Sequence, residues 1–522
     1  DKKYNKQTIA AKMTDVPGHT RSIIDPMYDA GIRLLHVGIN SACPLPSVPT
    51  FCRWRSPSGN DLLLVYQKDY GEDEVLPDGK TVVSINFTGD NHGPHSYERV
   101  KKIYADLRKR YPQAQLVGAS FNDVARELLL IKKDLPVVTS EIGDTWIFGY
   151  GGAPIRMAKF RAVSRLYSQW LNEGKIKKDS DVALDFAAEL GLIAEHTQGV
   201  DVKTHLRQWD KYDMDKFLKG RSEGIFSMAE ASWKEIDNYI DSAIAFLPAS
   251  LQKEAREVVA EVDKVKLEDN SKMKPMERKR WEQPIAGGMT LAGLSYQMFD
   301  GDDYDDFQNR YLRARYGWAL DDLGKRGLKE SHAVSVTLYA QTMAQSVRKE
   351  KKGTRIITEL RFPENEKVDK RVYPERIQVN CFTTKNGKRS EVALTIYGKP
   401  AVRLPESYWL SFTVPGIESV IAEKMGERVD LMDVVEKGNR QMHGIDRYVD
   451  LITSGETIRI SSKEAFLLNV GEAQGLNYST NYPDKRKGAH FNLNNNLWGT
   501  NFSMWNEGSL TYHFVIETLN RK

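Results

Sequence analysis

Three short loops carry the side chains whose types could do acid–base, nucleophilic or metal chemistry. These are Asp15 and His19 in residues 14–20, Asp90, His92 and His95 in residues 88–95, and Glu141, Asp144 and Trp146 in residues 140–146. Each loop contains glycine and follows a predicted strand, and in a parallel barrel such loops meet at one rim, where catalytic groups lie. Aspartate also caps helices and occupies turns, so each loop has a structural interpretation too. We expect the three loops to converge, because catalysis needs groups that meet at one place.

A fourth candidate is His196, in the segment of residues 194–200. This segment follows an apolar stripe of helical spacing made by Val182, Phe186, Leu190 and Ile193. A histidine at such a place can be part of the packing, or it can be a metal ligand, since imidazole nitrogen is a common ligand of zinc. The glycine and polar residues beside His196 favour an exposed rim and keep it among the candidates.

The first 150 residues alternate short apolar runs with amphipathic stretches, a pattern typical of βα units in a mainly parallel sheet or barrel. The expected strands are residues 8–13, 33–39, 62–66, 81–87, 115–118 and 135–139, and the expected helices are 20–30, 96–111 and 121–131. A closed barrel of this type needs seven or eight strands. We therefore expect residues 1–150 to be the catalytic domain, an incomplete (β/α)7-type barrel that lacks its first strand or strands. An open six-stranded sheet is the alternative.

The rest of the chain predicts two further domains. Residues 151–350 show helical periodicity, as on the face formed by residues 162–171, and predict a helical bundle domain. Expected helices there include residues 228–246, 251–265, 305–328 and 334–347. Residues 351–522 show β-branched and alternating runs with turn signals between them and predict an antiparallel β-sandwich domain. The expected fold class is therefore multidomain, α/β followed by α and then β.

Composition excludes several classes of protein. The formal net charge of +4 is spread over 75 basic and 71 acidic residues, too little and too dispersed to predict nucleic acid or an anionic membrane as the partner. No run of 18 apolar residues exists, so no membrane span is predicted. Three cysteines exclude a disulfide-dense secreted fold. The 10 Trp and 23 Tyr suit large cores and also a site where sugar rings stack on aromatic side chains.

At this point the motifs resemble a known family. Residues 14–20, Thr-Asp-Val-Pro-Gly-His-Thr, resemble the Asp-Pro-Phe-Gly-His-Ser signature of family 38 glycoside hydrolases, the retaining α-mannosidases. Residues 89–91, Gly-Asp-Asn, resemble their Gly-Asp-Asp segment, and residues 195–199 resemble their His-His-Asp-Ala-x-(Ser/Thr)-Gly element. The layout of barrel, bundle and β region is also similar. The sequence of residues 141–146 most resembles that of a bacterial branch of that superfamily.

The resemblance implies roles for particular residues. Asp15 matches the aspartate that is both nucleophile and zinc ligand, His196 matches a zinc-ligating histidine, and Asp90 lies in the segment that supplies the general acid/base. The sequence departs from the pattern at Asn91, which replaces the second acid, so Glu141 and Asp144 remain alternatives for the acid. The family's other two metal ligands, a His-x-Asp pair, normally precede the Asp15 motif, and residues 1–14 contain no histidine. We expect the segment that carries them to be absent here.

We therefore expect a retaining glycoside hydrolase that depends on Zn²⁺ or another divalent metal and cleaves a terminal α-linked sugar, with an α-mannoside as the candidate substrate. The side chains expected to contact the carbohydrate are His19, His92, His95, Asp144, Trp146 and Tyr150. A homo-oligomer is compatible with the sequence. A periplasmic or extracellular location is weakly favoured over a cytoplasmic one.

Two other functions fit the same residues. A polysaccharide deacetylase-like enzyme also uses aspartate and histidine at the mouth of an incomplete barrel, and it would release acetate rather than free sugar. A non-catalytic carbohydrate-binding protein with a decayed site would explain Asn91 and the missing His-x-Asp pair. A structural or scaffold fragment is a third, plainer possibility. Metal analysis separates the non-catalytic binding protein from the hydrolase, because a decayed module need not hold stoichiometric zinc.

Overall fold

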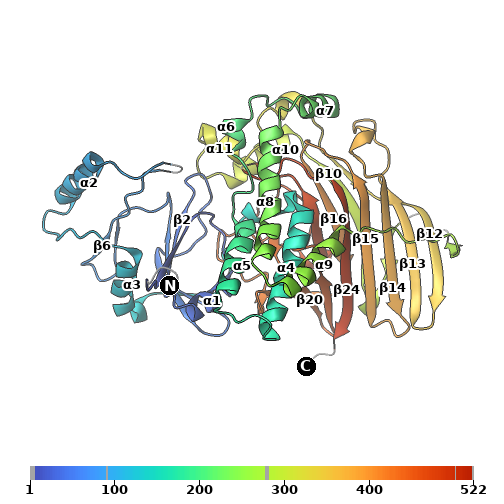
Figure 1. Cartoon of the computed structure of the whole chain (residues 1–522), viewed down its shortest axis with the longest axis horizontal. Coiled ribbons are helices and arrows are strands. Elements are labelled where there is room, and N and C mark those ends of the chain that lie inside the picture. The colour runs from blue at the N-terminus through green and yellow to red at the C-terminus, as the bar shows by residue number, and fades with distance from the viewer. Residues whose placement is uncertain (1–5, 90–91, 277–280, 500, 520–522) are drawn as a thin grey trace.

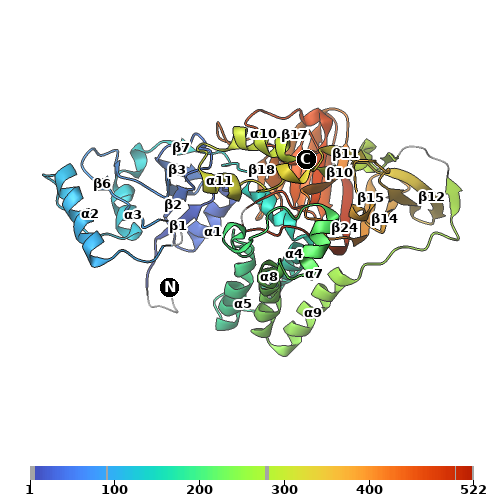
Figure 2. The ribbon, with the colours of Figure 1, turned by 90° about the horizontal axis from the view of Figure 1, so that it is seen from above.

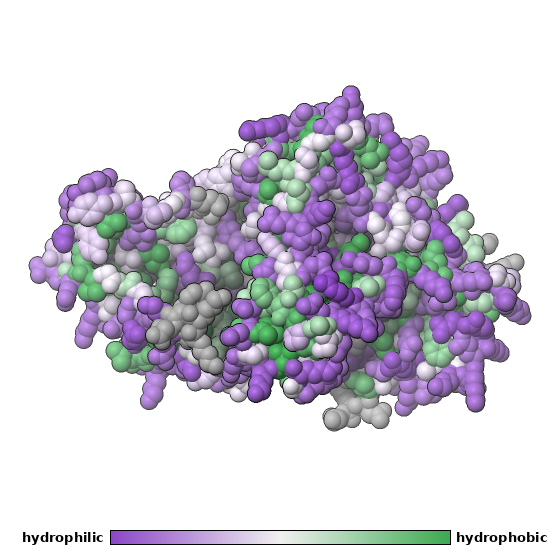
Figure 3. Space-filling model, in the orientation of Figure 1, coloured by the Kyte–Doolittle hydropathy of each residue, from purple (hydrophilic) through white to green (hydrophobic). Residues whose placement is uncertain are grey.

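The computed structural model describes residues 6–89, 92–276, 281–499 and 501–519. The molecule is elongated, with an N-terminal α/β part at one end, helices in front of the middle, and large β-sheets at the other end (Figures 1 and 2). Hydrophilic side chains cover most of the face shown in Figure 3, and apolar side chains gather there only in small separate patches.

The N-terminal part is built on a five-stranded sheet in the order β1-β2-β4-β3-β7. Its strands are β1 (Ala10–Asp15), β2 (Leu34–Ile39), β3 (Phe51–Arg55), β4 (Asp61–Gln67) and β7 (Val137–Val138). Every residue of β2 is buried, because apolar side chains cover both faces of the sheet. The helices around it are α1 (Ile24–Asp29), α2 (Tyr97–Arg110) and α3 (Phe121–Leu130).

This sheet differs from the predicted barrel in two ways. Strands β1, β2 and β4 are parallel, but β3 runs antiparallel to β4, and β7 runs parallel to β3. The prediction that residues 81–87 form a strand of this sheet is wrong, since β6 (Val82–Val83) pairs only with β5 (Glu74–Val75). Residues 115–118 form no strand either. The part of the chain that the structure describes therefore holds an open mixed sheet at this end.

The predicted helices of the middle region are present from residue 154 to residue 263. They are α4 (Pro154–Asn172), α5 (Asp181–Gly191), α6 (Val202–His205), α7 (Met214–Ser222), α8 (Ser227–Ala245) and α9 (Ala249–Asp263). The apolar stripes predicted on α4 and α5 face one core, where Trp170, Phe186 and Ile240 are buried together. Ser180 caps the N-terminus of α5 and Asp213 that of α7, as is favoured for residues with short oxygen side chains.

The change from helix to strand comes earlier than predicted. Strands begin at Lys274, and the prediction that residues 334–347 form a helix is wrong, because β11 (Val336–Tyr339) and β12 (Gln341–Glu350) occupy them. Apolar side chains at residues 334, 336, 338 and 340 alternate as in a strand, which fits the observed β11. Helices α10 (Gly301–Tyr311) and α11 (Gly317–Asp322) replace the single helix expected over residues 305–328. The division into three domains stays a prediction.

The large antiparallel sheets predicted for the C-terminal region are confirmed. One sheet has the order β11-β10-β16-β23-β22-β19, with β9 on β10, and the other has the order β18-β17-β20-β21-β24-β15-β14-β13-β12-β8. Their remaining bounds are β8 (Lys274–Met276), β9 (Gln283–Pro284), β10 (Thr290–Met298), β13 (Gly353–Arg361), β14 (Arg376–Thr384), β15 (Arg389–Lys399), β16 (Glu406–Thr413), β17 (Ile417–Lys424), β18 (Glu427–Asp430), β19 (Met442–Gly444), β20 (Tyr448–Thr453), β21 (Thr457–Ser462), β22 (Leu467–Val470), β23 (Ala489–Asn495) and β24 (Gly508–Leu519). Side chains of both sheets share one buried core. No helix in the described ranges is long and apolar enough to span a membrane.

One loop ties the N-terminal sheet to the β region. Residues 140–144, after β7, run beside residues 433–439, with hydrogen bonds from Glu141 N to Asp433 O (2.9 Å) and from Asn439 N to Gly143 O (3.0 Å). The backbones lie so close that a Cβ on Gly143 would overlap the carbonyl oxygen of Asn439. The small size of Gly143 is therefore a condition of this docking.

Replacing Gly143 by alanine tests the docking. We expect G143A to lower the free energy of unfolding by about 1 to 3 kcal/mol, because the added methyl group forces two backbones apart. Urea unfolding of both proteins measures the difference. The matched control is Gly191→Ala, where nothing lies within 4 Å of the added Cβ. Equal stability of G143A and wild type would show that the two segments are not closely docked in solution.

Candidate active site

Asp15 stands at the carboxyl end of β1, in register with Ile39 of the neighbouring parallel strand. Its φ angle is +95°, in the left-handed region that costs energy for a residue with a side chain. Backbone strain of this kind is found where the surrounding structure fixes a side chain for a purpose. Asp15 is thus the prime candidate for a functional group at this edge of the sheet.

Two neighbouring side chains hold one oxygen of the Asp15 carboxylate. Asn40 Nδ2 and the Tyr70 hydroxyl each donate to Oδ1 at 2.8 Å. Burial raises the pKa of Asp15, but the hydrogen bonds from His196, Asn40 and Tyr70 outweigh it and hold the pKa below its ordinary value. The carboxyl group is therefore ionised at neutral pH, with Oδ2 directed toward His196.

His196 lies beside Asp15, as predicted. Its Nε2 is 3.4 Å from Asp15 Oδ2, and its Nδ1 contacts the carboxylate of Glu195. The Tyr150 hydroxyl donates to Ala194 O at 2.8 Å, and the main chain of Gln198 donates to Asn501 O at 2.7 Å. These bonds fix the chain on either side of the histidine. Two segments 181 residues apart in the sequence thus place an oxygen and a nitrogen face to face.

The imidazole of His196 stands between two groups that only accept hydrogen bonds. A neutral ring carries one N–H, so it donates either from Nε2 to Asp15 Oδ2 or from Nδ1 to Glu195, and not to both. When Glu195 accepts that proton, a cation between Nε2 and Oδ2, either a second proton or a metal ion, removes the repulsion between their lone pairs. A histidine that binds a metal ion through one ring nitrogen usually contacts a carboxylate or carbonyl oxygen with the other, as Nδ1 does here.

A metal ion fits the pair but needs more ligands. Two donors that are each about 2.1 Å from a tetrahedral zinc ion are ~3.4 Å apart, which is the separation found here. Catalytic zinc usually has three protein ligands. Among the described residues, no group of three or more His, Cys, Asp or Glu side chains is placed to hold an ion. Asp15 and His196 would therefore supply two of the ligands.

Asp144 lies in a buried polar cluster next to the Asp15 loop. Its carboxylate accepts hydrogen bonds from Trp146 N (2.9 Å) and from the Tyr311 hydroxyl (3.1 and 3.2 Å). Burial raises the pKa of Asp144 to about 7. The approach to the Asp15 loop is close, because a Cβ on Gly18 would lie 2.7 Å from Asp144 Cβ. Asp144 is thus a carboxyl group that holds or releases a proton near neutral pH.

Trp146 and Tyr150, the predicted stacking residues, mainly support the site. The Trp146 ring lies 5.7 Å from the His196 ring and 5.4 Å from the Trp498 ring, and only 5% of the residue is exposed. Its Nε1 donates to Cys43 Sγ at 3.3 Å. Tyr150 uses its hydroxyl to hold the segment of His196. Contact of either ring with a sugar stays a prediction.

The histidines predicted as substrate contacts are spread over two loops. His19 forms a backbone bridge with Ile142, and burial lowers the pKa of His19 to about 4. His92 is exposed, and His95 Nε2 lies 2.8 Å from Asn86 O. Asp90, the predicted acid, and Asn91 lie outside the described residues. The roles of these residues stay predictions.

Glu141 is held as a structural anion. Its Oε1 accepts from Thr20 Oγ1 (3.0 Å) and Arg21 N (2.7 Å), and its Oε2 pairs with Lys424 Nζ at 2.7 Å. The side chains of Glu141 and Lys424 are 4% and 10% exposed. A carboxylate with all these partners is placed to join β17 to the Asp15 loop, and not to give a proton to a substrate.

The loop of residues 140–146 meets the Asp15 loop, as expected, but it does not come from the same end of the sheet. The carboxyl ends of β1, β2 and β4 meet, but β7 runs the other way, so residues 140–144 leave the sheet at its opposite edge and reach the Asp15 loop through the His19–Ile142 bridge. Sequence reasoning missed Asn40 and Tyr70, which follow β2 and β4. The same rule about strand ends would have found them, had it been applied to the second and third strands.

Comparison with solved structures finds proteins of similar fold. The chain matches an α-mannosidase from Enterococcus faecalis V583 over 100% of its own length and 75% of that protein, with a TM-score of 0.54 and 10% sequence identity. A second match is a glycosyl hydrolase family 38 protein from Enterococcus faecalis, with 100% and 74% coverage, a TM-score of 0.43 and 9% identity. Only the first match has a TM-score above 0.5, so it alone carries the comparison of fold. The chain shares the fold of an α-mannosidase, as the motifs predicted.

Sequence comparison is less informative. A family model described as "Domain of unknown function (DUF5054)" matches residues 151–283, a segment that contains His196. A search of curated proteins finds no significant match. The described helices α4–α9 make up most of this segment, so the family model covers the helical layer and one half of the Asp15–His196 pair.

The role of Glu141 can be tested by stability. We expect Glu141→Gln to lower the free energy of unfolding by roughly 3 to 5 kcal/mol, because it leaves the Lys424 ammonium buried without its counter-ion. The control is Glu472→Gln, which removes an exposed pair with Lys487 and should cost less than about 1 kcal/mol. Urea unfolding measures both. Unchanged stability combined with lost hydrolysis would make Glu141 the acid instead.

Proposed function

We propose that the chain is a retaining glycoside hydrolase that cleaves a terminal α-linked sugar, with an α-mannoside as the substrate we favour. The observation that carries this is the ionised, strained Asp15 facing His196 at the end of a parallel strand. The fold shared with an α-mannosidase over the whole length of the chain supports the same reaction. Fold alone does not fix function, so the site carries the proposal.

Asp15 is the nucleophile. A retaining enzyme needs one carboxylate that attacks the anomeric carbon and a second carboxyl about 5 Å away that protonates the leaving oxygen. Asn40 and Tyr70 donate to Oδ1, which keeps the carboxylate ionised and fixes the direction of Oδ2.

Asp90 is the general acid in this proposal, on the strength of its place in the Gly-Asp-Asn segment. Asp144 is the alternative. A pKa of about 7 lets Asp144 carry a proton at neutral pH. Its carboxylate is, however, enclosed by Tyr311 and the turn at Trp146, so a substrate oxygen would have to reach a buried group. This geometry favours Asp90.

The reaction is proposed to depend on a divalent cation, with Asp15 and His196 as two of its ligands. When bound, a zinc ion supplies a Lewis acid that can grip sugar hydroxyls. Glu195 holds the histidine ring by Nδ1 and so aims Nε2 at the shared position. The ring of Trp146 packs against the imidazole edge and limits its rotation.

A non-catalytic carbohydrate-binding protein is the second candidate. Asn91 in place of the second acid favours it, because an amide cannot donate the proton that the leaving oxygen needs. Such a protein would bind the sugar through the same site and release no product. Turnover therefore separates the two candidates.

Asp15→Asn tests the proposed function. The amide keeps an oxygen that accepts from Asn40 and Tyr70 but is no nucleophile, so we expect hydrolysis of an aryl α-mannoside to fall at least about a thousandfold. Thermal unfolding should show that the variant is folded. The product is measured as released phenol, with and without added zinc.

The control is Asp78→Asn, since Asp78 caps an exposed turn away from the site. It should hydrolyse at the rate of wild type. Full turnover by Asp15→Asn would contradict the assignment of the nucleophile. Wild-type protein that releases acetate from an acetylated oligosaccharide, and no sugar, would replace the glycosidase by a deacetylase.

A further inference from the structure

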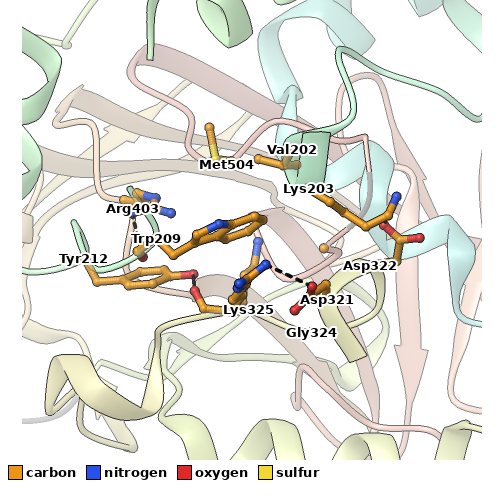
Figure 4. A pocket seen from close by; sticks show the side chains of 12 residues that line it. Val202, Lys203, Trp209, Tyr212, Asp321, Asp322, Gly324, Lys325, Arg403 and Met504 are labelled. Atoms are coloured by element: carbon orange, nitrogen blue, oxygen red, sulfur yellow. Dashed lines mark hydrogen bonds and ion pairs between the residues drawn. The ribbon is translucent and has the colours of Figure 1, made fainter. Parts of the chain in front are cut away.

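A pocket whose lining includes neither Asp15 nor His196 lies between the helical region and the β region. It is lined by α6, by the segment before α7, by the residues after α11 and by the C-terminal part of the chain (Figure 4). Its volume is about 390 Å³ with the open mouth included. The lining holds four cationic side chains and two carboxylates: Lys203, Lys325, Arg326, Arg403, Asp321 and Asp322.

Both carboxylates already have a cation. Asp322 pairs with Lys203 at 2.8 Å, and Asp321 pairs with Arg326 at 3.2 Å. Neither Lys325 nor Arg403 has a carboxylate within 4.0 Å among the residues that the structure describes. Two positive charges of the lining thus lack a direct ion pair in the described structure, although the more distant charge of Asp210 acts on Arg403.

Arg403 is the deeper of these two cations. Only 2% of the residue is exposed, and its guanidinium stacks on the Tyr212 ring at 4.1 Å. One nitrogen donates to Trp209 O at 3.3 Å, while Nε is buried without a hydrogen-bond partner in the described structure. Burying Nε of a charged guanidinium without an acceptor costs free energy. An anion that accepts from Nε would recover this cost.

Lys325 enters the same pocket from the segment after α11. Its Nζ donates to Trp498 O at 3.2 Å, which leaves two of its three protons for other acceptors. Burial, with a smaller contribution from the charge of Arg403, lowers the pKa of Lys325 to about 7. A planar guanidinium and a compact ammonium that repel each other across a small pocket make a site for an oxyanion.

We propose that this pocket binds a small tetrahedral oxyanion, sulfate or phosphate, between Arg403 and Lys325. The anion is either free or carried by a larger molecule such as a sugar. The indole of Trp209 and the side chain of Met504 provide an apolar wall for the carbon part of such a molecule (Figure 4). The proposal does not depend on the glycosidase reaction.

The pocket is nevertheless connected to the candidate active site. Lys325 holds the carbonyl of Trp498, the Trp498 ring lies 5.4 Å from the Trp146 ring, and Trp146 lies 5.7 Å from His196. An anion that orders Lys325 would therefore affect how Trp498 packs against Trp146, and how Trp146 packs against His196.

Calorimetric titration with sulfate, at constant ionic strength set with chloride, tests the proposal. We expect one sulfate per chain, and at least about tenfold weaker binding in Lys325→Gln and in Arg403→Gln, because each loses a charge-assisted hydrogen bond. Lys329→Gln is the matched control, since Lys329 is exposed and pairs with Asp305 outside the pocket. Its affinity should equal that of wild type.

The pH dependence gives a readout that a merely structural role would not move. Sulfate stays a dianion between pH 6 and 8.5, so its affinity should fall as the pH rises through about 7 and Lys325 loses its proton. Lys325→Gln should show no such fall. The other charged or titratable groups that face the pocket are Lys203, Tyr212, Asp321, Asp322, Arg326 and Arg403.

The outcomes are separable. A hexose 6-phosphate that binds more tightly than inorganic phosphate supports an anion carried by a sugar, and equal or weaker binding supports the free ion. Absence of saturable binding by wild type, or equal binding by wild type and Lys325→Gln, would overturn the proposal. Because Arg403 is buried, thermal unfolding of Arg403→Gln decides whether its result is counted, and Lys325→Gln carries the test if it is not.

Discussion

The site depends on an imidazole that is held between two carboxylates. Asp15 Oδ2 and His196 Nε2 are 3.4 Å apart, and the imidazole has a second carboxylate, Glu195, at its other nitrogen. A neutral ring satisfies one of these acceptors, so the other contact needs an added proton or a metal ion. The fold keeps the two atoms together by a strained backbone at Asp15 and by bonds on both sides of His196.

The arrangement is built from distant parts of the chain. β1 carries Asp15, the helical layer brings His196, and Glu141 docks the Asp15 loop on the β region through Lys424. This explains why a family model that covers residues 151–283 alone holds only half of the pair.

The sequence predicted the elements that local pattern controls and missed what strand pairing controls. Local pattern was sufficient to place α4, α5 and the C-terminal strands, through their apolar stripes and their alternation. The motifs were sufficient to single out Asp15 and His196. Strand direction leaves no local signal, so the reversal of β7 and the open sheet were not foreseen. Residues 334–347 were assigned the wrong period, because apolar side chains at residues 334, 336, 338 and 340 alternate as in a strand.

Calorimetric titration of the chelator-treated protein with zinc tests the central claim most directly, with His196→Ala as the comparison. If Asp15 and His196 share a cation, wild type binds one ion per chain and the variant binds it far more weakly or not at all, while both unfold at similar temperatures. Wild-type protein that binds no ion, or a variant that binds it as tightly, would contradict the account.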